Sequence, residues 1–214
     1  MSETRRLLDA ASALSRLLHA SNIPHAFYGS VFTAVISNVS QSDEIFCIVE
    51  GGQGQTHPFR RVRNALGGVN EFTTTHSPWT NRLHVTYRRP IPAIEVSVQA
   101  LVFTASLNEI QNSYSVKIEV LPAGETGPRR LDSSTVTTIQ GVPFLTVSEF
   151  IRAKLKTWMI RRSERDAKDI SYAMTKYWNK VDINRIPEQD MNFFVSRAPV
   201  IAPAWMALQR KYGM

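Results

Sequence analysis

The chain has 214 residues, of which 43% are hydrophobic and 20% are charged. These fractions are typical of a globular protein, and the length allows one substantial domain or one domain with a helical appendage. No apolar run approaches the roughly 20 residues of a membrane-spanning helix, and the N-terminus lacks a continuous signal-peptide core, so we expect neither. The single cysteine, Cys47, cannot form an intrachain disulfide, and we therefore expect a reducing, cytoplasmic compartment.

The net charge of +7 at pH 7 makes a polyanion a candidate partner: RNA, a nucleoside triphosphate or an acidic surface. The densest basic cluster is the segment 152–168, which contains seven Lys and Arg residues. Such a cluster is more often a solvated face whose charges pair with nearby acids. Binding of phosphate or RNA is the alternative that stays open for Lys154, Arg161 and Arg162.

The first half of the chain predicts a helix, a short extended segment and a strand. Residues 3–20 place Leu7, Ala11, Leu14 and Leu18 on one apolar stripe, as in an amphipathic helix. Residues 23–28 predict an extended entry into Gly29-Ser30, and residues 31–36 predict a helix or turn. Residues 44–50 are rich in Ile, Val and Phe and predict a strand that ends at two glycines.

The second half predicts strands followed by helices. Residues 59–65 predict a short basic helix, and the segments 83–87, 94–103 and 114–121 predict strands. Thr146 and Glu149 have the spacing of a capping box, which predicts a helix from there to about residue 162, and a second helix follows at about 164–178. We therefore expect an α+β fold, with a core over residues 1–141 and a helical C-terminal region over residues 142–214 packed on it.

The pair Gly29-Ser30, followed by a strand that opens with a carboxylate, is the pattern with the most chemical content. Glycine permits close approach of a phosphate, which backbone amides and the Ser30 hydroxyl could bind. Carboxylates at alternate strand positions share a face, and with a third on a neighbouring strand they can hold the metal ions of nucleotidyl transfer. Glu44 opens one such strand and Glu95 interrupts another apolar run, although a plain turn and two solvated glutamates would give the same pattern.

These residues resemble motifs of the nucleotidyltransferase superfamily, especially its minimal, toxin-type branch. Gly29-Ser30 resembles its Gly-Gly/Ser motif, Glu44-Ile45-Phe46 its paired-acid motif, and Glu95 with residues 82–87 the later hairpin with its third acid. Lys154, Arg162 and Lys168-Asp169-Ile170 are similar to a helical pair in that branch. The resemblance implies a transferase that binds a nucleotide or nucleotide-bearing substrate. It assigns catalysis to Ser30, Glu44 and Glu95, metal binding to Glu44 and Glu95, and phosphate binding to Gly29, Lys154, Arg161 and Arg162.

Phe46 stands where the resemblance places a second carboxylate, and a phenylalanine cannot bind a metal. Mg²⁺ is therefore an expected cofactor with only weak support in the motif. Two alternatives stay open: a transferase that depends on RNA or tRNA, or an RNA-binding protein, that reuses the fold without metal catalysis, and a non-catalytic pseudoenzyme. The five histidines lack metal-ligand spacing, so a zinc site is not expected.

Overall fold

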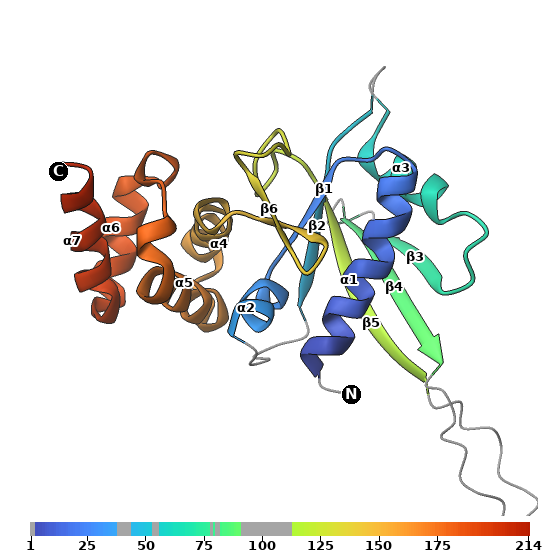
Figure 1. Ribbon diagram of the computed structural model, residues 1–214, viewed down its shortest axis with the longest axis horizontal. Helices are drawn as coiled ribbons and strands as arrows, with labels where there is room; N and C mark the ends of the chain where they lie inside the picture. Colours follow the sequence, from blue (N-terminus) through green and yellow to red (C-terminus); the bar gives the residue numbers. More distant parts are fainter. Residues whose placement is uncertain (1–2, 38–43, 53–55, 78, 80–81, 91–112) are drawn as a thin grey trace, which may run out of the picture.

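The computed structural model describes residues 3–37, 44–52, 56–77, 79, 82–90 and 113–214. Within these residues the strands form one mixed sheet in the order β3-β4-β5-β2-β1-β7-β6, with helices packed around it (Figure 1). The fold is therefore α+β, as the sequence predicts.

The strands are short except for the pair β4 and β5. Their bounds are β1 His25–Tyr28, β2 Ile45–Val49, β3 Phe72–Ser77, β4 Arg82–Pro90, β5 Ser113–Pro122, β6 Val136–Ile139 and β7 Val142–Leu145. The α-helices are α1 Glu3–Ala20, α2 Ser30–Ser37, α3 Pro58–Leu66, α4 Val147–Arg161, α5 Glu164–Tyr177, α6 Glu188–Arg197 and α7 Ala202–Lys211, and the 3₁₀ turns η2 Trp178–Lys180, η3 Ile183–Arg185 and η4 Pro199–Ile201 connect the last of them.

Strand β2 lies at the centre of the sheet between two partners of opposite direction. It runs antiparallel to β1, with Tyr28 opposite Phe46, and parallel to β5, with Phe46 opposite Glu119. Strand β1 also pairs in parallel with β7. The end of β1, the start of β2 and the later part of β5 therefore lie side by side.

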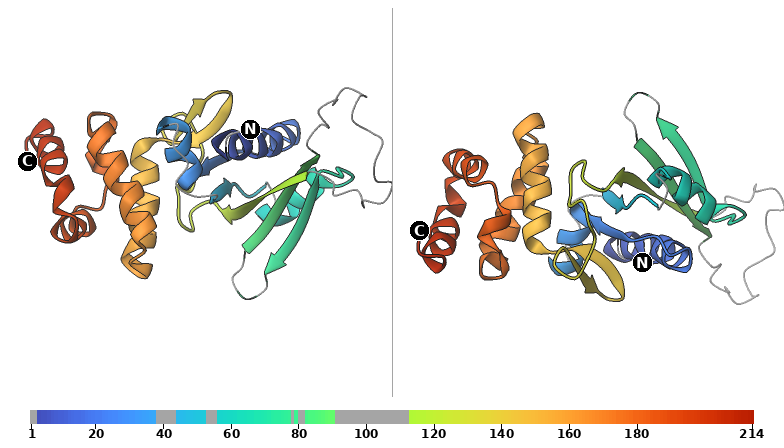
Figure 2. Two further views of the ribbon diagram at one scale, coloured as in Figure 1. Left: turned by 90° about the horizontal axis from the view of Figure 1, so that it is seen from below. Right: turned by 90° about the horizontal axis from the view of Figure 1, so that it is seen from above.

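The two faces of the sheet differ in what covers them. On β5 the alternate residues Val116, Ile118 and Val120 are buried, whereas Lys117 is exposed and Glu119 is half-buried. Helix α1 packs on the apolar face, where the hydroxyl of Tyr114 donates to Asp9 of α1 over 2.6 Å. Figure 2 shows α1 on one side of the strands and α4 to α7 beyond one end of the sheet. The opposite face is thus left to polar side chains over β4 and β5.

Several expected elements differ from the structure. Strand β4 pairs with β3 on one side and with β5 on the other. The strand expected at 94–103 lies outside the described residues. Residues 142–145 form β7 within the sheet, so the helical region begins at Val147 rather than at residue 142. Strands β3, β6 and β7 are not predicted by the sequence patterns.

The predicted capping box is also wrong, although the helix begins where expected. The Thr146 side chain makes no capping hydrogen bond and its buried hydroxyl has no partner. The Glu149 carboxylate instead accepts from Arg152 and from Arg185, the latter over 2.8 Å. The Glu149 carboxylate therefore bonds to two charged guanidinium groups rather than to the backbone amide of Thr146, because hydrogen bonds between charged groups are stronger.

No helix in the described part of the chain is long and apolar enough to cross a membrane. Cys47 is buried in β2, and burial raises the pKa of its thiol, so it is a packing residue and not a nucleophile.

His25 fixes the start of β1 against α1. Its Nδ1 lies 2.8 Å from the carbonyl oxygen of Ile23 and its Nε2 lies 2.8 Å from the Ser15 hydroxyl. The carbonyl can only accept, so Nδ1 carries the proton; in the neutral ring Nε2 then accepts from the Ser15 hydroxyl. Burial lowers the pKa of His25 below its ordinary value of 6.5.

This histidine predicts a loss of stability in mild acid. The pKa of His25 is lower in the folded chain than in the unfolded chain. The contribution of neutral His25 to the free energy of unfolding is therefore fully present above pH 6.5 and is lost as the pH falls below that value. We expect His25→Gln, which cannot be protonated, to show a smaller decline between pH 7.5 and pH 5.5 in urea titrations. The exposed His76→Gln variant is the control and should keep the wild-type decline. An unchanged pH dependence in His25→Gln would contradict the assignment.

Candidate functional site

The turn at Gly29 brings β1, α2 and the start of β2 into contact. Gly29 has φ +98°, and a Cβ atom there would lie 2.9 Å from the Phe46 ring and 3.0 Å from the Glu44 carbonyl oxygen. The amide of Val31 donates to the same carbonyl over 3.3 Å. Glycine is required because both the backbone angle and the space exclude a side chain. The close approach fixes Glu44 beside the first turn of α2.

Three neighbouring strands present a row of side chains to the open face of the sheet. Tyr28, Phe46 and Glu119 lie opposite one another on β1, β2 and β5, so their side chains share one face. The Tyr28 and Phe46 rings stack with centroids 4.9 Å apart and an interplanar angle of 30°. Glu119 is bonded to Arg82 of β4.

Burial keeps the Tyr28 hydroxyl neutral. It raises the pKa of Tyr28 to about 12, and the hydroxyl lies 3.0 Å from the Thr126 hydroxyl. The Tyr28–Phe46 pair is therefore an uncharged aromatic wall between charged groups on either side.

A buried lysine on α4 joins three carboxylates. The Lys154 ammonium lies 2.8 Å from Asp166, 3.0 Å from Asp169 and 3.2 Å from Glu44, and Lys154 is only 1% exposed. Burial alone would lower the pKa of Lys154, but attraction to Asp169, Glu44 and Asp166 outweighs it and raises the pKa. The lysine is therefore charged throughout the physiological range.

The hydroxyl groups of α2 complete this cluster. Ser30 donates to Asp169 over 3.3 Å and Thr33 donates to Asp169 over 3.0 Å, and both side chains are buried. The first turn of a helix attracts negative charge, so the Asp169 carboxylate is stabilised there. The Ser30 hydroxyl, which the sequence assigns to phosphate, faces a carboxylate of the chain itself.

A pocket of about 270 Å³ lies where the open face of the sheet meets α4. Its aromatic wall is Tyr28 and Phe46, and Glu44, Lys154 and Asp166 of the ionic cluster also line it. The other lining residues are Arg82, Glu125, Thr126, Lys156, Thr157, Ile160 and Arg161. The pocket thus combines aromatic surface with cations from β4 and α4.

The structure brings together most of the residues that the sequence nominates. Gly29, Ser30, Glu44 and Lys154 form one cluster, and Arg161 lines the pocket. Arg162 does not: its guanidinium carbon lies 4.4 Å from the Trp158 ring centroid and 4.6 Å from that of Phe193. Arg162 is exposed, lies against these two rings and does not line the pocket. Glu95 lies outside the described residues.

The sequence patterns do not identify Glu119 or Arg82 as residues of the site, and Asp166 enters only as one of the nearby acids that could pair with the basic cluster. Strand alternation places Glu119 on the face opposite to that of the buried residues Ile118 and Val120, but alternation alone cannot say which strand lies beside β2. The parallel pairing of β2 with β5 supplies that information. The signal for Asp166 is its spacing from Asp169, since residues three apart share a helix face.

Mg²⁺ is the metal that the resemblance implies, and the described residues do not fit it. Phe46 fills the position between Glu44 and Glu119, Lys154 binds Glu44, and Arg82 binds Glu119. No group of three His, Cys, Asp or Glu side chains in the described part of the chain is arranged to hold a metal. The three carboxylates that do converge surround the Lys154 ammonium.

The buried cluster predicts a large cost for removing Asp169. Asp169→Ala leaves the Lys154 ammonium with one fewer partner and the Ser30 and Thr33 hydroxyls without their carboxylate acceptor. Breaking a buried pair in this way costs about 3–5 kcal/mol of the free energy of unfolding. Urea titration measures this loss.

Glu164→Ala on the same helix is the control, because Glu164 is exposed. It should change the free energy of unfolding by about 0.5 kcal/mol or less. Equal stability of the two variants would show that the cluster does not stabilise the fold.

No protein-family model matches the chain, and no curated protein matches its sequence. Solved structures do match it. An antigenic nucleotidyltransferase-like protein from Paracoccidioides brasiliensis superposes with a TM-score of 0.63 and 17% identity, over 92% of this chain and 91% of that chain. JHP933 from Helicobacter pylori superposes with a TM-score of 0.55 and 12% identity, over 97% of this chain and 80% of that chain. The seven-stranded mixed sheet and its flanking helices are therefore a nucleotidyltransferase-like fold.

Proposed function

We propose that the chain is a nucleotidyltransferase-fold transferase of non-standard type, which binds a nucleotide-bearing substrate in the pocket between the sheet and α4. The observation that carries the proposal is the composition of this pocket. One wall is the stacked pair Tyr28 and Phe46, and Lys156 and Arg161 of α4 line the same space. A nucleotide has a flat base and anionic phosphates, which are the two chemical features that these walls match.

The aromatic wall accounts for binding of the base. Phe46 is half-buried in the pocket, and stacking of a base on an aromatic side chain contributes about 1–3 kcal/mol. Such stacking tolerates different bases, because every base has an aromatic face.

The cations account for binding of the phosphates. In the described residues Lys156 and Arg161 form no ion pair, whereas Arg82 is held by Glu119 and Lys154 by three carboxylates. Lys156 and Arg161 can therefore bind phosphate oxygens through charge-assisted hydrogen bonds. In the proposed transfer an acceptor oxygen forms a bond to phosphorus as the bond to the leaving phosphate breaks, and the two cations would stabilise the negative charge on that leaving phosphate.

Calorimetry with ATP, GTP, CTP and UTP tests this proposal. We expect saturable binding of at least one triphosphate, and weaker binding by about tenfold or more in Lys156→Gln and in Arg161→Gln. The exposed arginine Arg60 on α3 lies outside the pocket, so Arg60→Gln is the control and should bind as the wild type does. Absence of saturable heat with all four triphosphates, or equal affinity in all variants, would refute the pocket as a nucleotide site.

The distribution of charge favours RNA as the nucleotide-bearing substrate or as a second ligand. Residues 142–214 contain 13 Lys and Arg against seven Asp and Glu, whereas residues 1–141 contain 12 against 11. The helical region thus carries nearly all of the net charge. Lys168, Tyr172 and Lys176 follow one another at intervals of four on α5, and Lys180 continues the series in η2.

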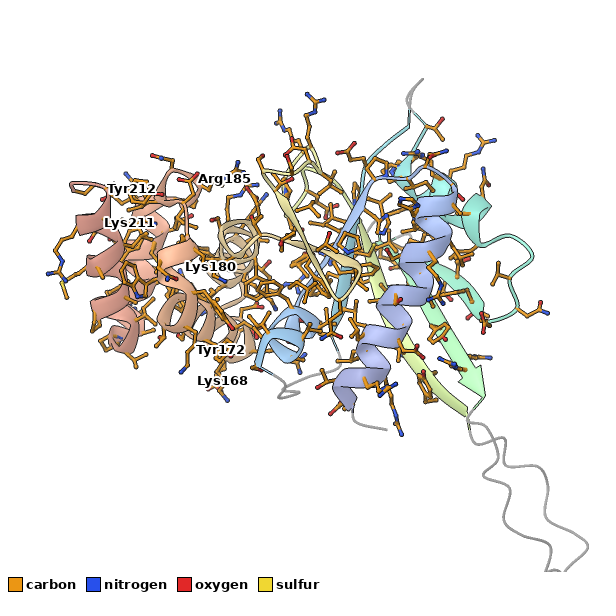
Figure 3. All side chains as sticks on the ribbon, in the orientation of Figure 1. Lys168, Tyr172, Lys180, Arg185, Lys211 and Tyr212 are labelled. Atoms are coloured by element: carbon orange, nitrogen blue, oxygen red, sulfur yellow. The ribbon has the colours of Figure 1, made fainter. Side chains whose placement is uncertain are left out.

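These residues form a surface that we call the lysine band: Lys168, Tyr172, Lys176, Lys180 and Lys211. Lys211 of α7 belongs to it because its ammonium donates to the Asn179 carbonyl oxygen over 2.9 Å. Figure 3 shows Lys168 near Tyr172, and Lys211 beside Tyr212 at the end of α7. The four lysines are exposed and form no ion pair within the described residues. Phosphates could bind the lysines while a base stacks on Tyr172.

Filter binding of a short single-stranded RNA at several salt concentrations tests the lysine band. Replacing Lys168, Lys176 and Lys180 with Gln should reduce the slope of log K against log salt by about 2, at about 0.7 per lost phosphate contact. Arg60, Arg63 and Arg130 are exposed residues outside the helical region. Replacing them with Gln removes the same amount of charge and should leave most of the RNA binding intact. Equal losses in both triple variants would mean that only net charge matters, which contradicts a specific surface.

A further inference from the structure

The Lys154 ammonium has the surroundings that a bound cation would have. An ammonium has three N–H donors, and three carboxylates lie within 3.2 Å of this one. They come from two places far apart in the sequence: Glu44 precedes β2, and Asp166 and Asp169 lie on α5. The ammonium donates hydrogen bonds to Glu44 and Asp166 and forms an ion pair with Asp169, so each of the three carboxylates contacts it.

The charges around the cluster are nearly balanced without any added ion. Glu44, Asp166 and Asp169 supply three negative charges. Lys154 supplies one positive charge, and the Arg165 guanidinium lies 3.6 Å from Glu44 and supplies a second. One negative charge remains in excess, and the first turn of α2 stabilises it, since the Ser30 and Thr33 hydroxyls donate to Asp169.

The distances distinguish this arrangement from an ion site. The nitrogen-to-oxygen distances of 2.8, 3.0 and 3.2 Å are those of charged hydrogen bonds. Mg²⁺ binds oxygen at about 2.0–2.1 Å and Ca²⁺ at about 2.3–2.6 Å, so the carboxylates would have to move inward around either ion. Beside the cluster, the Phe46 ring lies 5.8 Å from the ammonium, in the position opposite Glu119.

We propose that the Lys154 ammonium takes the place of a divalent cation in this site, so that the chain holds its carboxylates with a cation of its own and does not bind Mg²⁺ or Mn²⁺ there. The proposal rests on the proposed function for the location of the site. Its tests use the full chain without a nucleotide, so they can fail or succeed independently of nucleotide binding.

Titration of the wild-type chain with Mn²⁺, followed by electron paramagnetic resonance of the free ion, is the first test. We expect no saturable site at millimolar Mn²⁺. One Mn²⁺ bound per chain, with binding lost in Glu44→Gln, would overturn the proposal.

Removal of the ammonium is the second test. Lys154→Ala leaves Glu44, Asp166 and Asp169 around an open space, and we expect Ca²⁺ or Mn²⁺ to raise the melting temperature of this variant but not that of the wild type. Lys154→Met removes the charge and keeps most of the volume, so it should respond less than Lys154→Ala. Lys117→Ala, which removes an exposed lysine from β5, is the matched control and should not respond.

The two measurements remain decisive if Lys154→Ala does not fold alone. Refolding of that variant only in Ca²⁺ or Mn²⁺ would support the proposal, because the ion then replaces the ammonium. Failure of both ions to stabilise or refold it would overturn the proposal, since the carboxylates would not then form a cation site.

Discussion

The buried ammonium of Lys154 is the interaction on which the rest of the site depends. It joins Glu44, just before β2, to Asp166 and Asp169 on α5, and Asp169 in turn accepts from the hydroxyls of α2. Helices α4 and α5 are thereby fixed against the sheet by charge as well as by apolar packing. A buried charge without partners would cost several kcal/mol, so all four groups must be placed together or not at all.

The close approach of Gly29 to Phe46 positions the aromatic wall of the site. The missing side chain at Gly29 lets the Phe46 ring and the Glu44 carbonyl reach the turn, and the ring then stacks on Tyr28. Glu44 and Phe46 are two residues apart at the start of β2, so the aromatic wall and the carboxylate are neighbours. An uncharged aromatic surface therefore lies directly beside an ionic cluster, with the Phe46 ring centroid 5.8 Å from the Lys154 ammonium.

The sequence predicts local features of this fold well and long-range ones poorly. Helix α1, strand β2 and the pair α4 and α5 follow from apolar periodicity, which needs only neighbouring residues. The neighbour of β2 depends on how distant segments pair, and so Glu119 is not identified from sequence. Strand β3 is also missed, since most of its residues are exposed and no apolar alternation marks it.

The same distinction applies to the candidate site. Gly29-Ser30, Glu44 and Lys154 could be named from residue type and spacing, and the structure brings them together. The sequence also offers nearby acids as partners for the basic cluster, and Asp166 and Asp169 do pair with Lys154. The pairs that join distant segments, such as Lys154 with Glu44, could not be named, because these side chains meet only in the folded chain. Ser30 illustrates the difference: its hydroxyl donates to Asp169, which lies 139 residues away.

Phe46 alone does not explain why the described residues fail to fit a metal. A carboxylate at that position would lie between Glu44, already bonded to Lys154, and Glu119, already bonded to Arg82. Both flanking acids would have to leave their cations before they could share an ion, and each separation would leave a charge without its partner. The misfit to a metal is therefore not confined to Phe46. It also involves the ion pairs of Lys154 with Glu44 and of Arg82 with Glu119, which come from α4, β4, β5 and the residue before β2. Restoring a metal site would require changes at several of these positions together, since a single acid would add negative charge without freeing a ligand.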